Sequence, residues 1–282
     1  MTQNSTLFST KITSNESSIN SQAIGIFDSG VGGLSIAKCI HQHLPNESLI
    51  YVADSLFAPY GDKSSTVIIE RVNKLADWLI SQDVKAIVVA CNTATVIAID
   101  QLRLRVNIPI IGVEPAIKPA ARHSTTQKIA LLVTEATAVN HRFLALVDKH
   151  KNGAQAFIQP CAGLVELIEQ GLHESERCRQ LLNGFLQPLL KNNIDKLVLG
   201  CTHYPFVSTM IQEIVGEEVT IMETALPVTE QLIRQLSHNN LLANGDHLFQ
   251  KRFFSSQLSL HQEKLMSTLF EKKSSLGPLP LL

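Results

Sequence analysis

The feature that most limits how this chain can fold is a short apolar segment that ends at a cysteine and occurs twice. Residues 87–94 read IVVACNTA, and residues 197–205 read LVLGCTHYP. β-Branched and apolar runs of this length are typical of buried strands in a parallel sheet. Polar residues suited to the start of a helix follow each cysteine. The sequence therefore predicts a strand, a cysteine and a helix start, in that order, at two places.

Both cysteines are predicted to lie where an α/β sheet binds its ligand. In open α/β sheets the ligand crevice lies at the carboxyl ends of the strands. A helix N-terminus next to the thiol is expected to lower the thiol pKa toward neutrality, because that end carries partial positive charge. The alternative is a pair of buried, inert cysteines, since free cysteine is among the most buried residue types. The repeated pattern favours a functional role for Cys91 and Cys201, whereas Cys39, Cys161 and Cys178 have no such context.

The rest of the chain alternates between short apolar runs and segments with helical periodicity. This alternation indicates parallel sheets with helices on both faces. Residues 23–28 and 129–134 each run from a predicted strand into a polar strand end, one upstream of each cysteine. We therefore expect an α/β fold of two similar doubly wound parallel-sheet domains that face one cleft. The predicted units are a disordered N-terminal arm at 1–22, a first domain at 23–113 plus 224–282, and a second domain at 114–223. Within the first domain, residues 249–282 give no clear prediction of secondary structure.

The composition argues against several functional classes. A formal charge of −1 leaves no electrostatic footprint for nucleic acid or an anionic membrane, and no apolar run is long enough for a membrane span. The five cysteines include no Cys-x-x-Cys pair, so no zinc ribbon or thioredoxin motif is predicted. With no signal peptide predicted at the N-terminus, we expect a cytoplasmic protein with reduced thiols. The glycine-rich run at 28–33 fails the dinucleotide-binding spacing, because its third glycine position is Ser35.

Two thiols in one cleft are compatible with four kinds of chemistry. A disulfide would suit a redox role, and a metal site would need more ligands than a Cys-x-His segment supplies. A Cys–His nucleophile would leave the other thiol unexplained. The fourth possibility uses both thiols: one removes a proton from a carbon and the other delivers a proton to its opposite face. For that chemistry each sulfur should lie roughly 3–3.5 Å from the carbon, so the sulfurs should be about 7 Å apart.

Four motifs, taken together and in order, resemble the glutamate racemase family. They are DSGVGG at 28–33, PYG at 59–61, CNTA at 91–94 and GCTHYP at 200–205. The resemblance extends from about residue 23 to about residue 235. It implies two similar α/β domains that enclose glutamate, and a reaction without pyridoxal phosphate, any other cofactor or a metal. It also implies that Cys91 takes the α-proton from D-glutamate and that Cys201 takes it from L-glutamate.

The resemblance assigns roles to the residues around the two thiols. Asp28 and His203 match the family's assisting acid and base, and Glu169 falls where the family often places a further carboxylate near the second cysteine. The residues that match substrate-binding positions are Asp28, Ser29, Tyr60, Gly61, Asn92, Thr93, Thr137, Thr202 and His203. At Ala136 the chain departs from the glycine that the family more often has there, a change that is expected to alter the turn before Thr137.

The resemblance also implies a place in the cell and a set of partners. The product D-glutamate would supply peptidoglycan synthesis. UDP-N-acetylmuramoyl-L-alanine is implied as an activator, and the protein is expected to be a monomer or a homodimer. Two other functions stay open at this point. One is racemisation of aspartate or a related acid. The other is a non-catalytic binding protein, although binding a carboxylate needs hydrogen-bond donors and gains nothing from two nucleophilic thiols.

Overall fold

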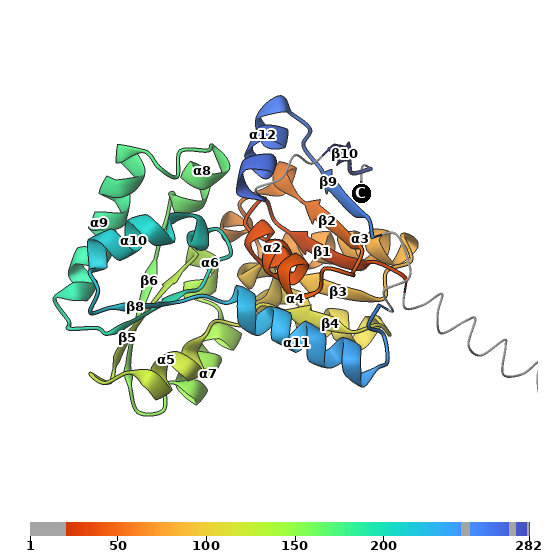
Figure 1. Ribbon diagram of the computed structural model, residues 1–282. Helices are drawn as coiled ribbons and strands as arrows, with labels where there is room; N and C mark the ends of the chain where they lie inside the picture. The colour runs from red at the N-terminus through yellow and green to blue at the C-terminus, as the bar shows by residue number, and fades with distance from the viewer. Residues whose placement is uncertain (1–20, 244–248, 271–274, 281) are drawn as a thin grey trace, which may run out of the picture.

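The fold is built on two parallel sheets (Figure 1). The structure is a computed structural model that describes residues 21–243, 249–270, 275–280 and 282. The first sheet has the spatial order β10 (Leu276–Pro278), β9 (Lys251–Ser255), β2 (Leu49–Ala53), β1 (Ile24–Asp28), β3 (Ala86–Val89) and β4 (Ile110–Gly112). The second sheet has the order β6 (Gln155–Pro160), β5 (Lys128–Val133), β7 (Lys196–Leu199) and β8 (Thr220–Met222). All the paired strands are parallel.

The two sheets share one topology. The order β2-β1-β3-β4 in the first sheet corresponds strand for strand to β6-β5-β7-β8 in the second. In each sheet the chain leaves the first strand, adds a neighbour on one side, and then crosses to the other side. The point of reversal lies between β1 and β3 in one sheet and between β5 and β7 in the other, and ligands bind at such switch points in open α/β sheets. The predicted fold class is confirmed.

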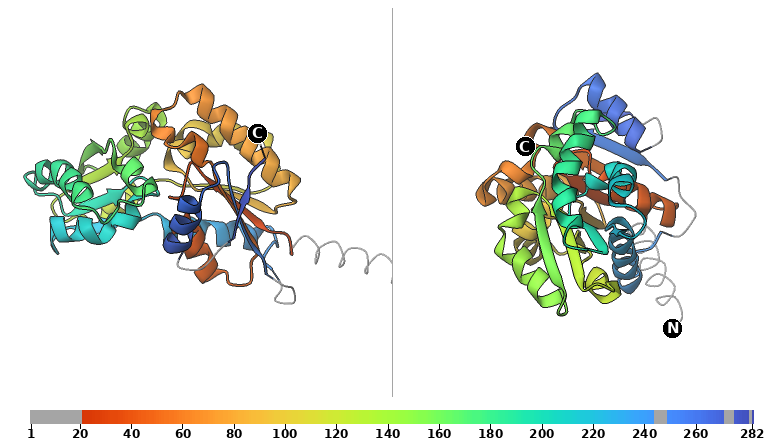
Figure 2. Two further views of the ribbon diagram at one scale, coloured as in Figure 1. Left: turned by 90° about the horizontal axis from the view of Figure 1, so that it is seen from above. Right: turned by 90° about the vertical axis from the view of Figure 1, so that its left-hand side faces the viewer.

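Helices cover both faces of each sheet, as the strand sequences require (Figure 2). In β1, Ile24 and Ile26 pack toward one face while Phe27 packs toward the other, which is the period of two expected of a strand. The helices on the two faces of the first sheet are α2 (Leu34–His43), α11 (Ala225–His238) and α12 (Leu260–Leu269) on one side, and α3 (Ser65–Ser81) and α4 (Asn92–Arg105) on the other. Those of the second sheet are α8 (Leu164–Glu169), α9 (Glu176–Leu190) and α10 (Ser208–Val215) on one side, and α5 (Ile117–His123) and α7 (His141–His150) on the other. The short elements between them are η1 (Ser55–Phe57), η2 (Tyr60–Asp62), α6 (Glu135–Ala138) and η3 (Tyr204–Val207).

The last part of the chain adds two strands to the first sheet, whereas the sequence analysis assigned residues 224–282 to the first domain without predicting these strands. Strand β9 pairs in parallel with β2, with Phe253 opposite Tyr51, and β10 extends the sheet beyond β9. Helix α12 packs against α2. The predicted N-terminal arm falls, except for residues 21–22, outside the described residues. Within the described part of the chain, no helix has the length and apolar character needed to cross a membrane.

Candidate active site

The carboxyl ends of the two sheets face each other and bring the predicted residues together. Asp28 ends β1 and Cys91 follows the neighbouring β3, while Thr134 follows β5 and Cys201 follows the neighbouring β7. Contacts between the two edges include a hydrogen bond of 3.0 Å between the hydroxyls of Thr93 and Thr134. The facing edges therefore carry corresponding strand-end residues from the two halves.

The first thiol itself caps α4. The sulfur of Cys91 accepts a hydrogen bond from the Ala94 N–H at 3.5 Å and donates to the Ser29 hydroxyl at 3.6 Å. Burial raises the pKa of the Cys91 thiol well above its ordinary value, the negative charge of Asp28 raises it further, and the Ala94 N–H lowers it only in part. The prediction that the helix start lowers this pKa is therefore wrong, because desolvation outweighs one N–H dipole.

Asp28 lies beside this thiol with one oxygen bound and one free. Its Oδ2 accepts hydrogen bonds from the N–H groups of Gly33 at 2.8 Å and Gly30 at 3.4 Å, so it caps the glycine-rich turn. Its Oδ1 has no hydrogen-bond partner among the described residues, and the same holds for Oδ1 of buried Asn92. Burial raises the pKa of Asp28 to about 6, although the charge of His203 and the Gly33 N–H oppose the shift. Two buried acceptors without partners indicate that a ligand or water satisfies them.

The second thiol has an imidazole and a carboxylate behind it. Sγ of Cys201 lies 3.7 Å from Nδ1 of His203, and Nε2 of that ring lies 2.7 Å from Oε1 of Glu169. Oε1 of Glu169 also accepts from the N–H of Val31 at 2.7 Å, across the interface between the sheets. Burial lowers the pKa of His203, but its hydrogen bonds to Cys201 and Glu169 outweigh that effect and raise the pKa well above its ordinary value. The structure therefore places beside Cys201 an imidazole whose surroundings favour its charged form.

The chain after the second cysteine differs from the prediction. No helix begins at Thr202; the short helix η3 comes first, and α10 starts only at Ser208. The main-chain oxygen of Thr202 instead accepts a hydrogen bond of 3.2 Å from the Ser35 hydroxyl of α2. The repeated strand–cysteine pattern thus holds, whereas an α-helix begins directly after the cysteine only at Cys91; after Cys201 the chain first forms the 3₁₀ turn η3, with Pro205 at its start, and this turn leads into α10.

The glycine-rich run at 28–33 is explained by close approach of the other half. A Cβ on Gly30 would overlap the carboxylate of Glu169, and a Cβ on Gly32 would overlap the imidazole of His203. Gly61 in η2 similarly lies against Thr134, where a Cβ would be 3.2 Å from the Cβ of that threonine. These glycines let the facing side chains reach the interface between the sheets.

Three threonines, one from the first half and two from the second, join the two halves. The hydroxyls of Thr93, Thr134 and Thr137 lie within 2.9 to 3.3 Å of one another. Thr137 reaches this cluster despite the alanine before it. Thr134 was not among the predicted site residues, although its place directly after β5, like that of Asp28 after β1, was a usable signal.

Tyr60 has a different position from the one expected for a substrate-binding hydroxyl. Its hydroxyl donates to Oδ2 of Asp54 at 2.7 Å, and Arg71 donates two hydrogen bonds to the same carboxylate. The ring is buried, with 1 % of its surface exposed. Tyr60 therefore packs next to the site and is bonded to this ion pair, which fixes η2 and with it Gly61.

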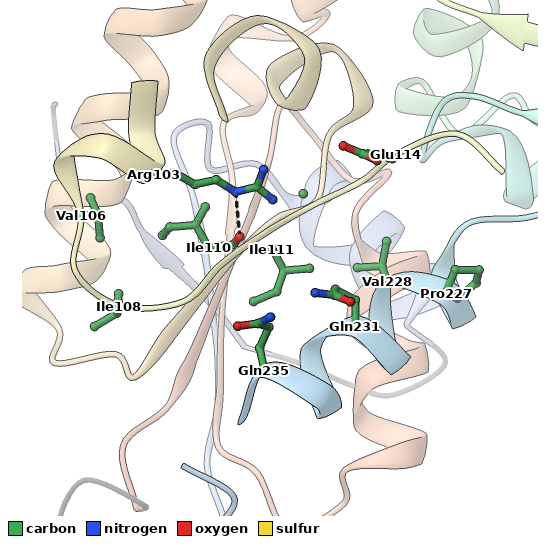
Figure 3. Close-up of a pocket in the computed structure, with 11 residues that line it drawn as sticks. Arg103, Val106, Ile108, Ile110, Ile111, Glu114, Pro227, Val228, Gln231 and Gln235 are labelled. Carbon is green, nitrogen blue, oxygen red and sulfur yellow. Dashed lines mark hydrogen bonds between the residues drawn. The ribbon is translucent and has the colours of Figure 1, made fainter. Parts of the chain in front are cut away.

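The two thiols are buried, with 5 % of Cys91 and 7 % of Cys201 exposed, and neither lines a pocket described below. One pocket, of about 270 Å³, is bordered by Pro59, Glu169 and His261. Figure 3 shows a larger one, of about 550 Å³, between α4 and β4 on one side and α11 on the other; Arg103, Gln231 and Gln235 line it, and neither thiol does. The larger pocket is therefore a separate feature from the thiol site.

Comparison with known proteins agrees with this arrangement. Residues 32–241 match the model of the Asp/Glu/Hydantoin racemase family. The glutamate racemase of Pseudomonas aeruginosa is 43 % identical over 262 residues, which cover 93 % of this chain and 98 % of that protein. The crystal structure of Francisella tularensis glutamate racemase in complex with D-glutamate has a TM-score of 0.82 at 30 % identity and covers 92 % of this chain and 98 % of that one. Escherichia coli glutamate racemase in complex with L-glutamate and the activator UDP-MurNAc-Ala has a TM-score of 0.81 at 29 % identity, over 93 % of this chain and 99 % of that one.

Proposed function

The chain belongs to the Asp/Glu/Hydantoin racemase family and, within it, to the glutamate racemases. We therefore propose that it interconverts L- and D-glutamate with Cys91 and Cys201 as the two bases. The observation that carries the two-base mechanism is the pair of strand-end thiols with unlike neighbours on facing sheet edges. Cys91, whose pKa is raised by burial, can donate a proton, and the imidazole of His203, whose pKa is raised, lies 3.7 Å from the sulfur of Cys201, where its positive charge would stabilise negative charge that develops on that sulfur.

In this mechanism the proton transfers are complementary. With L-glutamate, the thiolate of Cys201 takes the α-proton, the electrons of the broken C–H bond stay on the α-carbon, and Cys91 delivers its own proton to the opposite face. With D-glutamate the same steps run backward, so Cys91 is the base and Cys201 the acid. Asp28, with a pKa of about 6, can assist proton movement at Cys91, because groups that titrate near ambient pH are the most effective acids and bases.

The polar groups of the site suit an amino acid. The unpartnered Oδ1 atoms of Asp28 and Asn92 are acceptors that an α-ammonium group would satisfy. Donors for the two carboxylates would come from hydroxyl groups around the thiols, namely those of Ser29, Thr93, Thr137 and Thr202. Because the thiols are buried, we also propose that substrate enters when the units 23–113 plus 224–282 and 114–223 move apart.

Proton NMR in deuterated water tests this function directly. We expect purified protein, incubated separately with L- and D-glutamate and no added cofactor, to lose the α-proton signal and to form the opposite enantiomer. Exchange with aspartate but not with glutamate would assign the chain to a different amino acid. Absence of exchange with both acids, in the presence and absence of an activator, would contradict racemisation and favour a binding protein.

We further propose that the reaction takes place in the cytoplasm, supplies D-glutamate to peptidoglycan synthesis and responds to UDP-N-acetylmuramoyl-L-alanine. Five free cysteines agree with a reducing compartment. The pocket of Figure 3 is the candidate activator site, because its volume of about 550 Å³, the guanidinium of Arg103 and the amides of Gln231 and Gln235 suit a nucleotide sugar with a diphosphate. Racemisation rates with and without this precursor, in the native chain and in Arg103→Gln, test the proposal. If the precursor does not change the racemisation rate of the native chain, the proposed activation is contradicted.

A further inference from the structure

Helix α8 ends in a motif that leaves one carbonyl for an outside partner. The N–H of Gly171 bonds the carbonyl of Ile168 at 2.9 Å, and the N–H of Leu172 bonds that of Leu167 at 2.8 Å. Gly171 has a φ of +71°, so the helix ends in a Schellman motif with glycine in the left-handed conformation. This motif does not satisfy the carbonyl of Glu169, the last residue of the helix.

His261 of α12 supplies the missing donor. Its Nε2 lies 3.1 Å from the main-chain oxygen of Glu169, and because a carbonyl only accepts, this nitrogen carries the hydrogen. Gly171 also makes room for the ring, since a Cβ there would be 3.4 Å from Cε1 of His261. Helix α12 packs against α2 in the first half of the molecule, whereas α8 belongs to the second half; Figure 1 shows the two helices as neighbours. The hydrogen bond therefore connects the two halves.

Glu169 is thus held at both its main chain and its side chain. His261 binds its carbonyl oxygen, and its carboxylate accepts from His203 and from the N–H of Val31. We propose that His261 is a positioning residue for the Cys201 side of the reaction: by fixing the end of α8, it holds the carboxylate of Glu169 against His203. This inference rests on the proposed two-cysteine function. It concerns a residue outside the 32–241 range that matches the family model.

The inference predicts an effect on one side of the site only. If the end of α8 moves, the carboxylate of Glu169 supports the imidazolium less well and the pKa of His203 falls, because that hydrogen bond raises it. Proton removal by Cys201 then becomes slower, while Cys91, whose hydrogen bonds are to Ser29 and Ala94, is affected less. Replacing the α-hydrogen by deuterium should therefore slow the turnover of L-glutamate more strongly in the variant than in the native chain, with a smaller change for D-glutamate.

The test compares His261→Ala with His261→Gln, whose side-chain amide can donate to the same carbonyl, and with His238→Ala at an exposed position on α11. We expect His261→Ala to lower kcat about fivefold, the factor that corresponds to loss of one ordinary hydrogen bond. His261→Gln should recover most of that loss, and His238→Ala should behave as the native chain does. Glu169→Gln, which removes the charge itself, should shift the isotope effects in the same direction and further.

A second measurement does not depend on activity. NMR titration of the His203 ring should give a lower pKa in His261→Ala than in the native chain and an intermediate or native value in His261→Gln. Equal His203 titrations in all variants would overturn the inference, as would equal isotope effects on both enantiomers. If the native chain does not racemise glutamate, the proposed function fails, while the His203 titration still decides whether His261 holds Glu169 in place.

Discussion

The two halves of this molecule share the order of their four common strands and place their thiols at corresponding strand ends, yet they surround the two sulfurs differently. Cys91 lies beside a buried carboxyl group and an N–H dipole, and its pKa is raised. Cys201 lies beside the imidazole of His203, whose pKa is raised by its hydrogen bonds to Cys201 and Glu169. The difference shows that repeated topology sets where the thiols are, whereas a few neighbouring side chains set the charge that surrounds each sulfur. Unequal environments of this kind separate an acid from a base.

Racemisation places a thermodynamic limit on how this inequality can be observed. L- and D-glutamate have equal free energies in water, so the ratio of kcat/KM in the two directions must equal one for every variant. A change confined to one half therefore cannot favour one direction in kcat/KM. It can appear in kcat, in KM, in isotope effects and in solvent exchange, and the predictions below use these quantities.

The largest expected effect comes from removing each thiol in turn. Cys91→Ser and Cys201→Ser should each lower racemisation by at least about 10³-fold, since a positioned acid or base contributes about 10²–10⁴-fold and here each is needed in both directions. In deuterated water, Cys201→Ser should still exchange the α-proton of D-glutamate, and Cys91→Ser that of L-glutamate, without inversion. Proton NMR measures both exchange and inversion.

Cys161→Ser is the matched control for this experiment. Cys161 is also buried, its thiol donates to the Gln159 carbonyl at 3.5 Å, and burial raises its pKa to about 12. This variant should racemise glutamate at close to the native rate. Racemisation by either of the other two variants at more than about one per cent of the native rate would contradict the two-base mechanism.

A second, smaller effect separates function from stability at Asp28. The pKa of Asp28 is about 6 in the folded state and 3.8 in the unfolded chain, so between pH 4 and 6 the folded state binds more protons than the unfolded state does. The free energy of unfolding therefore decreases as the pH rises through that range. The full penalty, about 3 kcal/mol for roughly two pKa units, is present above pH 6. Asp28→Asn should therefore lower kcat about 100-fold, yet raise the free energy of unfolding at pH 8 by up to about 3 kcal/mol.

Urea unfolding of Asp28→Asn at pH 8 and pH 5 checks the sign of this effect. The stability gain should be smaller at pH 5, and Asp62→Asn, at an exposed position, should show no such gain at either pH. A variant less stable than the native chain at pH 8 would show that the carboxylate of Asp28 stabilises the folded state, against the prediction.

The smallest effect tests how closely the two halves must meet. Gly30→Ala places a methyl group where the carboxylate of Glu169 lies, so it should hold the halves apart and raise KM for glutamate about tenfold. Gly184→Ala in α9 has nothing within 4 Å of its new Cβ. It should leave KM unchanged and stabilise the protein by about 0.5–1 kcal/mol through helix propensity. Equal KM values in the two variants would argue against a close fit at Gly30.

The sequence was most informative at the strand ends. The apolar runs before Asp28, Cys91, Thr134 and Cys201 are long enough to identify strands, and parallel pairing then brings their ends to one edge of each sheet. The secondary structure of residues 249–282 was not predicted, because β9 and β10 are short strands, and the pairing of β9 with β2 and of β10 with β9 is set by the folded sheet and not by local pattern.

Two properties of the site depend on contacts that no local pattern encodes. The pKa of Cys91 is set by burial, which exists only once both halves have folded around it. The pairing of His261 with Glu169 joins residues 92 positions apart. The sequence analysis showed only that the glycines at 30 and 32 fail the dinucleotide-binding spacing, whereas the facing half explains why they carry no side chain.

The chain passes between the sheets twice, from β4 to α5 and from β8 to α11. Two covalent connections define a line, and rotation about that line is the relative movement of the halves that stretches neither of them. In Figure 1 both connections lie at the lower side of the interface, and α8 and α12 lie at its upper side. The hydrogen bond from His261 joins α8 to α12 on the side opposite these connections, so rotation about that line would separate its two partners.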